Sequence, residues 1–181
     1  MTGAVARRYA RALFDLAVEG NTAESVDGEL VRLAAAASAP EIEPVLRNPM
    51  LSPSRRRELA ELLAREFAVS DLLARFLALL ADRRRLDEVP AIAAYFRILL
   101  DERLGRVRAT IRAASGLEDG QKQSLVETFS QLTGKAVLAE VVVDAELLGG
   151  VLVEVAGRVY DGSVRTHFER LAKQFASSGS I

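Results

Sequence analysis

The 181-residue chain has no cysteine and no tryptophan, and His167 is its only histidine. The absence of cysteine excludes disulfide bonds, thiolate catalysis and thiolate metal sites. A zinc site would then need several carboxylates, a poor match to the ligands that zinc prefers. We therefore expect a protein with no metal ion and no cofactor.

His167 by itself is a weak basis for an enzyme. Catalytic use would require a nucleophile and an orienting acid close by. Glu169 lies two residues away, and side chains at this spacing do not face each other on a helix. A small enzyme using His167 is the weakest functional hypothesis, and a surface histidine is the preferred interpretation.

The chain also lacks a long hydrophobic run and an excess of charge of either sign. No apolar run approaches the ~20 residues that a membrane-spanning helix needs. The net charge is −1, with 15 basic and 16 acidic residues up to Leu104 and nine of each after it. Neither half is a polycation, which argues against nucleic acid as the main partner. We expect a soluble protein that associates with membranes only through partners.

The first residues are arginine-rich and amphipathic, so a transit peptide has to be considered. Asp15 and Glu19 continue the same helical pattern, and serine is scarce there. Transit peptides are poor in acidic residues and rich in serine. We expect this segment to be the first helix of the folded protein.

Two glycine-containing stretches resemble phosphate-binding loops only superficially. Gly134-Lys135 is followed by Ala136, where a P-loop needs Ser or Thr, and no glycine stands five residues before Gly134. Gly149-Gly150 lacks the third glycine and the following helix of a dinucleotide-binding motif. Both are interpreted as turn glycines, and no nucleotide site is predicted.

Residues 4–104 show a helical period throughout, with apolar side chains three and four residues apart. Asn21 is a candidate cap for the second helix, and Ser52-Pro53 and Ser70-Asp71 are start signals for later ones. Pro90 fits only the first turn of a last helix over residues 86–104. With a short helix near residues 42–47, the pattern predicts an N-terminal all-α six-helix bundle over residues 1–104.

After Gly105 the apolar period changes from 3.6 to 2. Strands are predicted at residues 107–113 and 137–143, with a helix between them over residues 118–132. A hairpin then opens at Gly149-Gly150 and turns at Gly157-Arg158, and Asp161-Gly162 breaks its second strand so that Ser163 caps a final helix. Residues 105–181 are therefore expected to form a small α+β C-terminal module.

The first helix carries more apolar surface than one core face needs. Such a helix is either deeply buried or covered by a partner, and both possibilities stay open. In the second, the first and fifth helices lie side by side and form a groove for a partner's amphipathic helix. The residues expected to line that groove are Tyr9, Ala12, Leu13, Phe76 and Leu79.

Two arginine runs, Arg55–Arg57 and Arg83–Arg85, are the only strongly basic segments. One interpretation is a patch that contacts phosphates. The other is a pair of solvated helix ends, favoured for Arg83–Arg85 by the helix dipole. Aromatic residues are not interleaved with either run, as stacking on single-stranded nucleic acid would require.

Four stretches resemble, in this order along the chain, the delta subunit of the rotary (F-type) ATP synthase. This family includes the mitochondrial oligomycin-sensitivity-conferring protein. The resemblance covers essentially the whole chain, and its most specific part is the C-terminal one. His167 departs from the small or basic residue frequent in the family. The four stretches are Val5–Phe14, Asn48-Pro49 with Ser52-Pro53, Leu80–Leu86 with Val89–Ile92, and Gly149-Gly150 through Asp161–Arg165 to Leu171.

The resemblance implies a non-catalytic stator subunit at the cytoplasmic face of the cell membrane, which links the catalytic head to the peripheral stalk so that rotor torque drives ATP synthesis. In that family the N-terminal bundle holds the N-terminal helix of an alpha subunit, here in the predicted groove. The C-terminal module holds the stalk formed by b subunits; here Phe168, Leu171 and Phe175 would meet the stalk or pack on the sheet. The alternative is a nucleic-acid-binding bundle of the antitermination-factor type that uses the two arginine runs.

Overall fold

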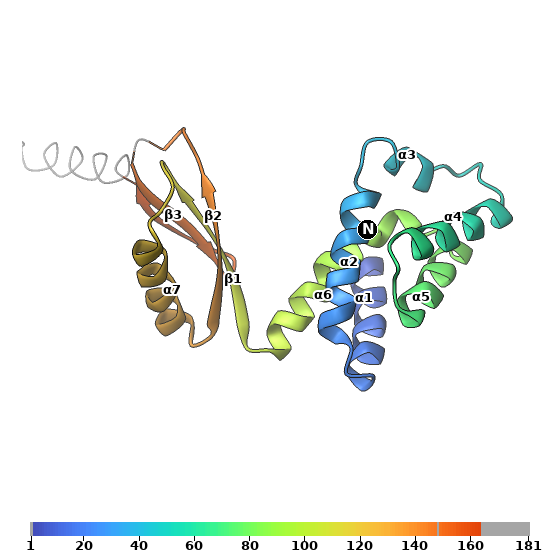
Figure 1. Cartoon of the computed structure of the whole chain (residues 1–181), viewed down its shortest axis with the longest axis horizontal. Helices are drawn as coiled ribbons and strands as arrows, with labels where there is room; N and C mark the ends of the chain where they lie inside the picture. Colours follow the sequence, from blue (N-terminus) through green and yellow to red (C-terminus); the bar gives the residue numbers. More distant parts are fainter. Residues whose placement is uncertain (1, 148, 164–181) are drawn as a thin grey trace, which may run out of the picture. The chain divides into compact units, whose positions relative to one another are not determined.

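A computed structural model describes residues 2–147 and 149–163 (Figure 1). The chain divides into two compact units, Met1–Leu100 and Asp101–Ile181. Each unit has its own hydrophobic core. The two units are therefore described separately.

The first unit is helical, as the sequence predicts. Within it, α3 is a single turn of four residues and η1 is a 3-10 helix. The helical character of this part is confirmed, whereas the count of six helices stays a prediction. Its elements are α1 (Thr2–Glu19), α2 (Ala23–Ala37), α3 (Glu43–Leu46), α4 (Pro53–Glu66), α5 (Asp71–Asp82), η1 (Leu86–Glu88) and α6 (Val89–Arg103), whose last residues belong to the second unit.

Local sequence signals explain where several helices begin. The Ser52 hydroxyl caps α4 by accepting a hydrogen bond from the backbone N–H of Arg55 at 3.3 Å. Pro90 lies in the first turn of α6, where its missing N–H costs no helical bond. The predicted cap of α2 is wrong: Thr22 holds that position, and Asn21 has a positive φ of 53° in the preceding turn, which asparagine tolerates.

Successive turns of α1 supply one side of the core. Its fully or nearly fully buried residues are Ala6, Ala10, Leu13, Phe14 and Ala17. The Phe14 ring meets the Phe96 ring of α6 edge to face, with 5.4 Å between centroids. Small alanines let the neighbouring helices approach closely, and each large buried apolar side chain contributes about 1.5–3 kcal/mol to stability.

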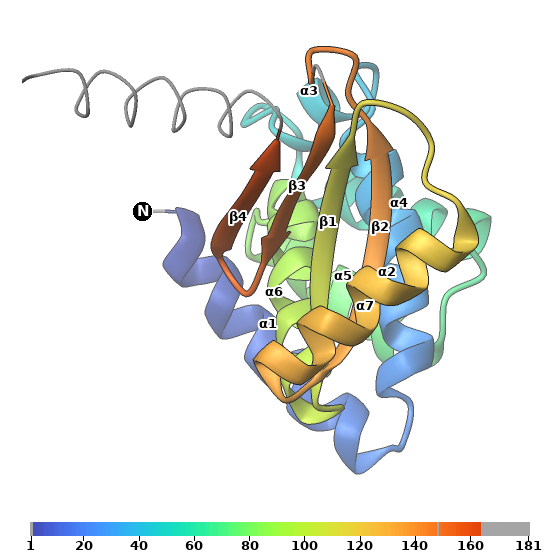
Figure 2. The same ribbon diagram turned by 90° about the vertical axis from the view of Figure 1, so that its left-hand side faces the viewer.

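The second unit is a four-stranded mixed sheet with one helix on a face. Its strands are β1 (Arg106–Ala113), β2 (Ala136–Val143), β3 (Gly150–Val155) and β4 (Arg158–Ser163), in the spatial order β2-β1-β3-β4. β1 pairs in parallel with β2 through the crossover helix α7 (Asp119–Thr133), and β3 pairs antiparallel with β1 and β4. Figure 2 shows α7 crossing the sheet on one side. Ile111, Val153 and Phe129 are at the centre of this core.

The hairpin prediction needs two corrections. The two-residue turn is Ala156-Gly157, because Val155 pairs with Arg158; both turn residues have positive φ, 53° and 73°. Asp161-Gly162 does not break the strand, since β4 continues to Ser163, which pairs with Gly150. Ser163 is therefore a buried strand residue, with its N–H donating to Asp161 Oδ1 at 2.8 Å. The final helix that it is expected to cap lies outside the described residues.

Candidate functional site

The candidate site is the surface that α1 and α5 share. Tyr9 of α1 and Phe76 of α5 meet edge to face, with 6.2 Å between ring centroids. Around this contact, apolar side chains that the core leaves partly uncovered follow each helix at helical spacing. We call this surface the α1–α5 face and define it by Val5, Tyr9, Ala12 and Leu16 of α1 with Leu72, Phe76 and Leu79 of α5.

The five predicted groove residues occupy different depths at this surface. Ala12 is exposed, Tyr9 is half-buried and Leu79 is 43% exposed. Leu13 and Phe76 are only 1% and 8% exposed, so both are core residues, and Phe76 borders the face through its ring contact with Tyr9. The buried stripe of α1 and its uncovered stripe therefore adjoin at Leu13. One side of α1 is core, and the groove on its uncovered side stays a prediction.

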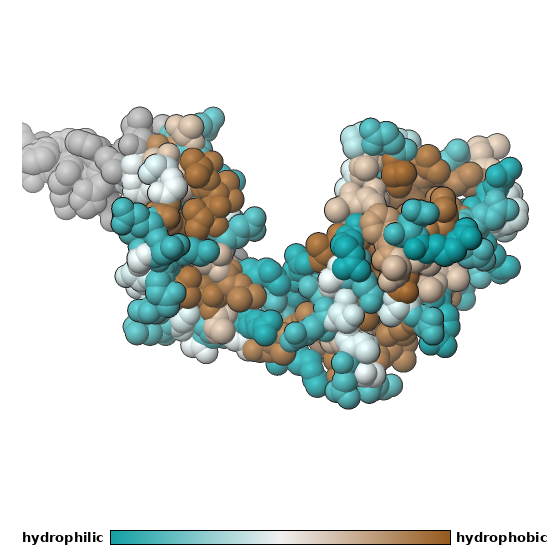
Figure 3. Space-filling view, in the orientation of Figure 1, coloured by the Kyte–Doolittle hydropathy of each residue, from teal (hydrophilic) through white to brown (hydrophobic). Residues whose placement is uncertain are grey.

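Three residues of the α1–α5 face were not among the five. Leu16 is 52% exposed, and Val5 and Leu72 are half-buried. Leu16 follows Ala12 by four residues and Leu72 precedes Phe76 by four, so the helical period contained the signal. Hydrophobic residues reach the surface in both units, where they are brown in Figure 3.

α1 and α5 run in opposite directions across this face. The Glu29 carboxylate of α2 accepts hydrogen bonds from the backbone N–H and the hydroxyl of Ser70, at 2.9 and 2.8 Å, which ties the start of α5 to α2. Because α2 folds back along α1 from its C-terminal end, the start of α5 lies near the later turns of α1. Phe76 lies one to two turns after the start of α5, and its partner Tyr9 precedes the later turns of α1. The end of α5 is therefore beside the first turns of α1.

The fold brings the two arginine runs together at that end. Arg57 of α4 makes a two-point ion pair with Asp82 of α5, at 2.7 and 3.1 Å. This hydrogen bond lowers the pKa of the Asp82 carboxyl and raises the pKa of Arg57. Both side chains are exposed, so the pair adds little to stability. Arg83 also lowers the pKa of the Asp82 carboxyl through its charge, but neither Arg83 nor Arg84 forms an ion pair within 4 Å with a described residue.

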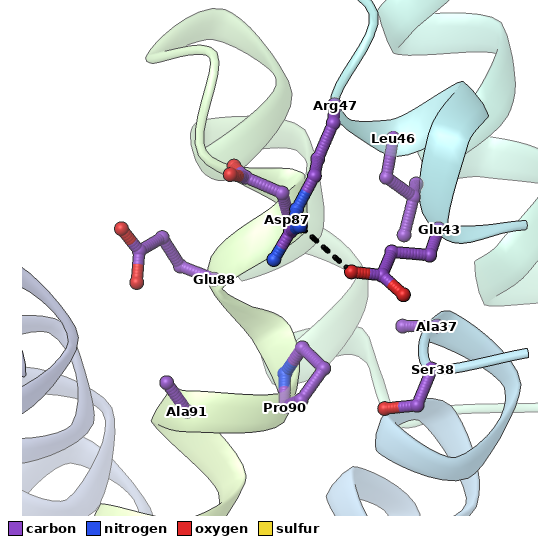
Figure 4. Close-up of a pocket in the computed structure, with 9 residues that line it drawn as sticks. All are labelled: Ala37, Ser38, Glu43, Leu46, Arg47, Asp87, Glu88, Pro90 and Ala91. Atoms are coloured by element: carbon purple, nitrogen blue, oxygen red, sulfur yellow. Dashed lines mark ion pairs between the residues drawn. The ribbon is translucent and has the colours of Figure 1, made fainter. Parts of the chain in front are cut away.

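A separate cavity of about 230 Å³ lies where α2, α3 and α6 meet (Figure 4). Glu43 and Arg47 form an ion pair of 2.8 Å at its edge. Glu88 contributes to the wall, and in Figure 4 its carboxylate points away from the other lining residues. No hydrogen bond among the described residues joins Ser38, Asp87 or Glu88 of the lining to one another, so the cavity does not contain an assembled nucleophile and base.

In the second unit an apolar cavity of about 470 Å³ adjoins α7, lined in part by Leu125, Phe129, Val153 and Tyr160. The predicted stalk residues Phe168, Leu171 and Phe175, and also His167, lie outside the described residues. Across residues 2–147 and 149–163, no group of three or more histidines or acids could hold a metal ion. No helix in the same part of the chain is long and apolar enough to cross a membrane.

Comparisons with known proteins agree on one family. The family model described as ATP synthase delta (OSCP) subunit matches residues 5–175. The ATP synthase subunit delta of Anaeromyxobacter dehalogenans (strain 2CP-C) is 42% identical over 174 residues, 96% of this chain and 97% of that protein. The protein of the same description from Desulforamulus reducens is 37% identical over 181 residues, 99% of each chain.

One solved structure supports the fold. A chain of the cryo-EM structure of the Toxoplasma gondii mitochondrial ATP synthase hexamer superposes with a TM-score of 0.70 and 21% identity, covering 94% of this chain and 97% of that one. None of these comparisons supports the alternative of a nucleic-acid-binding bundle.

Proposed function

The chain belongs to the ATP synthase delta (OSCP) family, and from this premise we propose which of its surfaces hold which partners. It is a non-catalytic stator subunit of the ATP synthase, and its partners are within that complex. A stator has to resist torque, which requires tight contacts between helices and no reaction chemistry. The first unit would hold the catalytic head and the second unit the peripheral stalk.

The α1–α5 face would receive the N-terminal helix of an alpha subunit. The observation that carries this proposal is the uncovered apolar stripe beside the Tyr9–Phe76 contact. An amphipathic helix docks on such a surface through side chains at i, i+3, i+4 and i+7. Ala12 lets the incoming backbone approach closely, and Tyr9 offers an aromatic body with a hydroxyl that can bond at the rim. Leu13 would support Tyr9 and Ala12 from below, and Leu79 would extend the contact along α5.

The second unit would bind the b subunits of the stalk, with Phe168, Leu171 and Phe175 as its apolar contacts. This part of the proposal is based on the family and on the helical spacing of those three residues. Through the stalk the protein would be held at the cytoplasmic face of the cell membrane as a peripheral component. No contact of its own with lipid is required.

The test is Ala12→Glu in the full chain, assayed for binding to a synthetic peptide of the alpha subunit's N-terminal segment. The substitution places a charge in a contact that loses its water on binding, so affinity should fall at least tenfold. Because Ala12 is exposed in the free chain, the thermal unfolding midpoint should stay within about 2 °C.

Ala78→Glu is the matched control, since Ala78 is exposed on α5 and lies off the α1–α5 face. It should bind the peptide like the unaltered chain. Equal losses in the two variants would remove the assignment of this face, and unfolding of the Ala12→Glu chain would show that the face is core.

A further inference from the structure

We propose that charge at the two ends of the α1–α5 face fixes the direction of the bound helix, with an acidic first turn of that helix against Arg83 and Arg84. This inference rests on the proposed function. It adds the charge pattern of the partner and its orientation, which apolar docking alone leaves open.

On α5, the apolar stripe of the face is followed directly by an arginine. Leu72, Phe76, Leu79 and Arg83 follow each other at steps of three and four, so they share one side of the helix. Arg83 ends the helix as its C-cap, and Arg84 follows. On α1, Arg8 follows Val5 by three residues, and its guanidinium lies 5.7 Å from the Tyr9 ring centroid. The end of the face near the start of α1 is therefore basic.

These charges are available to a partner. Asp82 is the acid next to Arg83 in the sequence, and Arg57 occupies both of its oxygens. Glu88 is nearest to Arg85, at 3.7 Å. Arg83 and Arg84 make no ion pair with any described residue, and Arg83 acts on Asp82 only through longer-range charge, so no ion pair within the described part of the chain has to break before they bind an external carboxylate.

Arg84 is also in a conformation that glycine adopts more easily. Its φ is +57°, and its N–H bonds Ala81 O at 3.2 Å while the Arg85 N–H bonds Leu80 O at 2.8 Å. This is the Schellman arrangement, whose left-handed position is usually glycine because a Cβ is strained there. An arginine at such a position is a local cost to the folded chain, which points to a use for its charge outside the fold.

The opposite end of the face is acidic. Asp15 and Glu19 follow Ala12 and Leu16 by three residues, so each borders the α1 stripe. Asp71 opens α5 at the same end, and all three side chains are exposed. The nearest basic group on α1 is Arg11, whose contact with Asp15 is 3.9 Å long.

A helix with acids in its first turn and bases in its last turn complements this arrangement. That distribution also suits the helix dipole, so it costs the partner nothing. Its first turn would lie beside Arg83 and Arg84 and its last turn beside Asp15, Glu19 and Asp71. The bound helix therefore runs parallel to α1 and antiparallel to α5.

The direction can be measured by energy transfer, because the chain has neither tryptophan nor cysteine. The probe is a peptide of the alpha subunit's N-terminal segment with tryptophan added at its N-terminus. The full chain carries an acceptor dye on either Ala4→Cys or Gly20→Cys, which are exposed at opposite ends of α1. The two sites are about 24 Å apart along the helix at 1.5 Å per residue. Transfer should be stronger to position 4, and stronger transfer to position 20 overturns the proposal.

The charge contribution is tested with Arg83→Glu/Arg84→Glu. Its peptide affinity should fall about tenfold at low ionic strength and less at high salt. Arg55→Glu/Arg65→Glu changes the net charge equally on exposed positions of α4 and should change affinity less than about twofold. Replacing the acids in the peptide's first turn by amides should remove the difference between the altered and unaltered chains.

Two failures are distinguishable. If the peptide does not bind the unaltered chain, the proposed function fails and the orientation fails with it. If the peptide binds and Ala12→Glu abolishes binding, but Arg83→Glu/Arg84→Glu binds like the α4 control, the face is the docking site and only the charge-set direction is wrong.

Discussion

Among single residues, Glu88 is an acid in surroundings that disfavour its charge. Its side chain is 2% exposed, and neither carboxylate oxygen accepts a hydrogen bond from any residue that the structure describes. The nearest cation is Arg85, at 3.7 Å. Burial raises the pKa of the Glu88 carboxyl, Asp87 raises it further, and Arg85 offsets part of the effect. The folded chain therefore holds the Glu88 proton more tightly than the unfolded chain does.

This linkage predicts a pH dependence of stability. A folded-state pKa above the unfolded value stabilises the fold below the unfolded pKa, about 4.3 for glutamate, and this contribution is lost as pH rises through the folded pKa. Glu88→Gln removes the charge, so its free energy of unfolding at pH 7 should exceed that of the unaltered chain by about 1 kcal/mol. The difference should vanish near pH 4. Urea unfolding across pH measures it, with exposed Glu41→Gln as the control; a gain that is independent of pH would contradict the explanation.

The backbone conformation of Arg84 leads to a second prediction for a single residue. Because its φ of +57° suits glycine, Arg84→Gly should raise the free energy of unfolding by about 1 kcal/mol. Arg83 has an ordinary helical φ of −85°, so Arg83→Gly should lower it instead. Urea unfolding of the pair checks this opposite sign. A loss of stability in both variants would mean that the Arg84 side chain stabilises the fold more than its backbone strains it.

At the scale of elements, the sequence contained the information that is local in the chain. The Ser52-Pro53 start of α4, Pro90 in α6 and the change of period after Gly105 all depend on residues within one or two turns of each other. The sequence predicts the hairpin turn one residue too late, at Gly157-Arg158, because Ala156 also has a positive φ and forms the turn with Gly157. Turn type depends on strand register, and register is set by the pairing of β3 with β1 and β4.

Contacts between segments that are distant in the chain could not be predicted from the sequence. Ser70, the N-cap residue of α5, is held by the carboxylate of Glu29, which lies 41 residues earlier in the chain. The Arg57–Asp82 pair joins positions 25 residues apart, and it brings the two arginine runs together. At the candidate site, the apolar stripe of α1 could be predicted from its period. The depth of each residue could not, since burial of Leu13 and exposure of Leu16 depend on which neighbour covers them.

Substitutions at two glycines of the hairpin distinguish the cost of steric overlap from the cost of backbone strain. Gly150 has φ +80°, and a Cβ there would overlap the carbonyl oxygen of Gly162 on the paired strand. Gly157 has φ +73°, with no atom within 4 Å of its Cβ position. Gly150→Ala should therefore cost more than about 2 kcal/mol, and Gly157→Ala about 1 kcal/mol. Denaturant unfolding followed by a probe in the second unit measures both, and equal costs would show that the overlap relaxes.

At the scale of the whole molecule, each unit has its own core, so each can lose its partner surface without unfolding the other. The described sheet ends with Ser163, whose pairing with Gly150 closes β4. A chain ending at Ser163 therefore retains every described strand and the complete α1–α5 face. The proposed stalk contacts lie beyond that point.

Residues 1–163 should bind the alpha-subunit peptide with the affinity of the full chain and should fail to bind the b subunits. The reason is that the α1–α5 face depends only on packing within the first unit, whereas Phe168, Leu171 and Phe175 are removed. The full chain with all three changed to alanine is the matched variant, because it keeps the chain length and loses only apolar contact area, with about 2 kcal/mol or more expected for each central aromatic contact. Calorimetric titration with each partner measures both affinities. Undiminished capture of the b subunits by residues 1–163 would move the stalk site onto the described sheet, and reduced peptide binding would mean that the first unit needs the C-terminal residues to form its docking face.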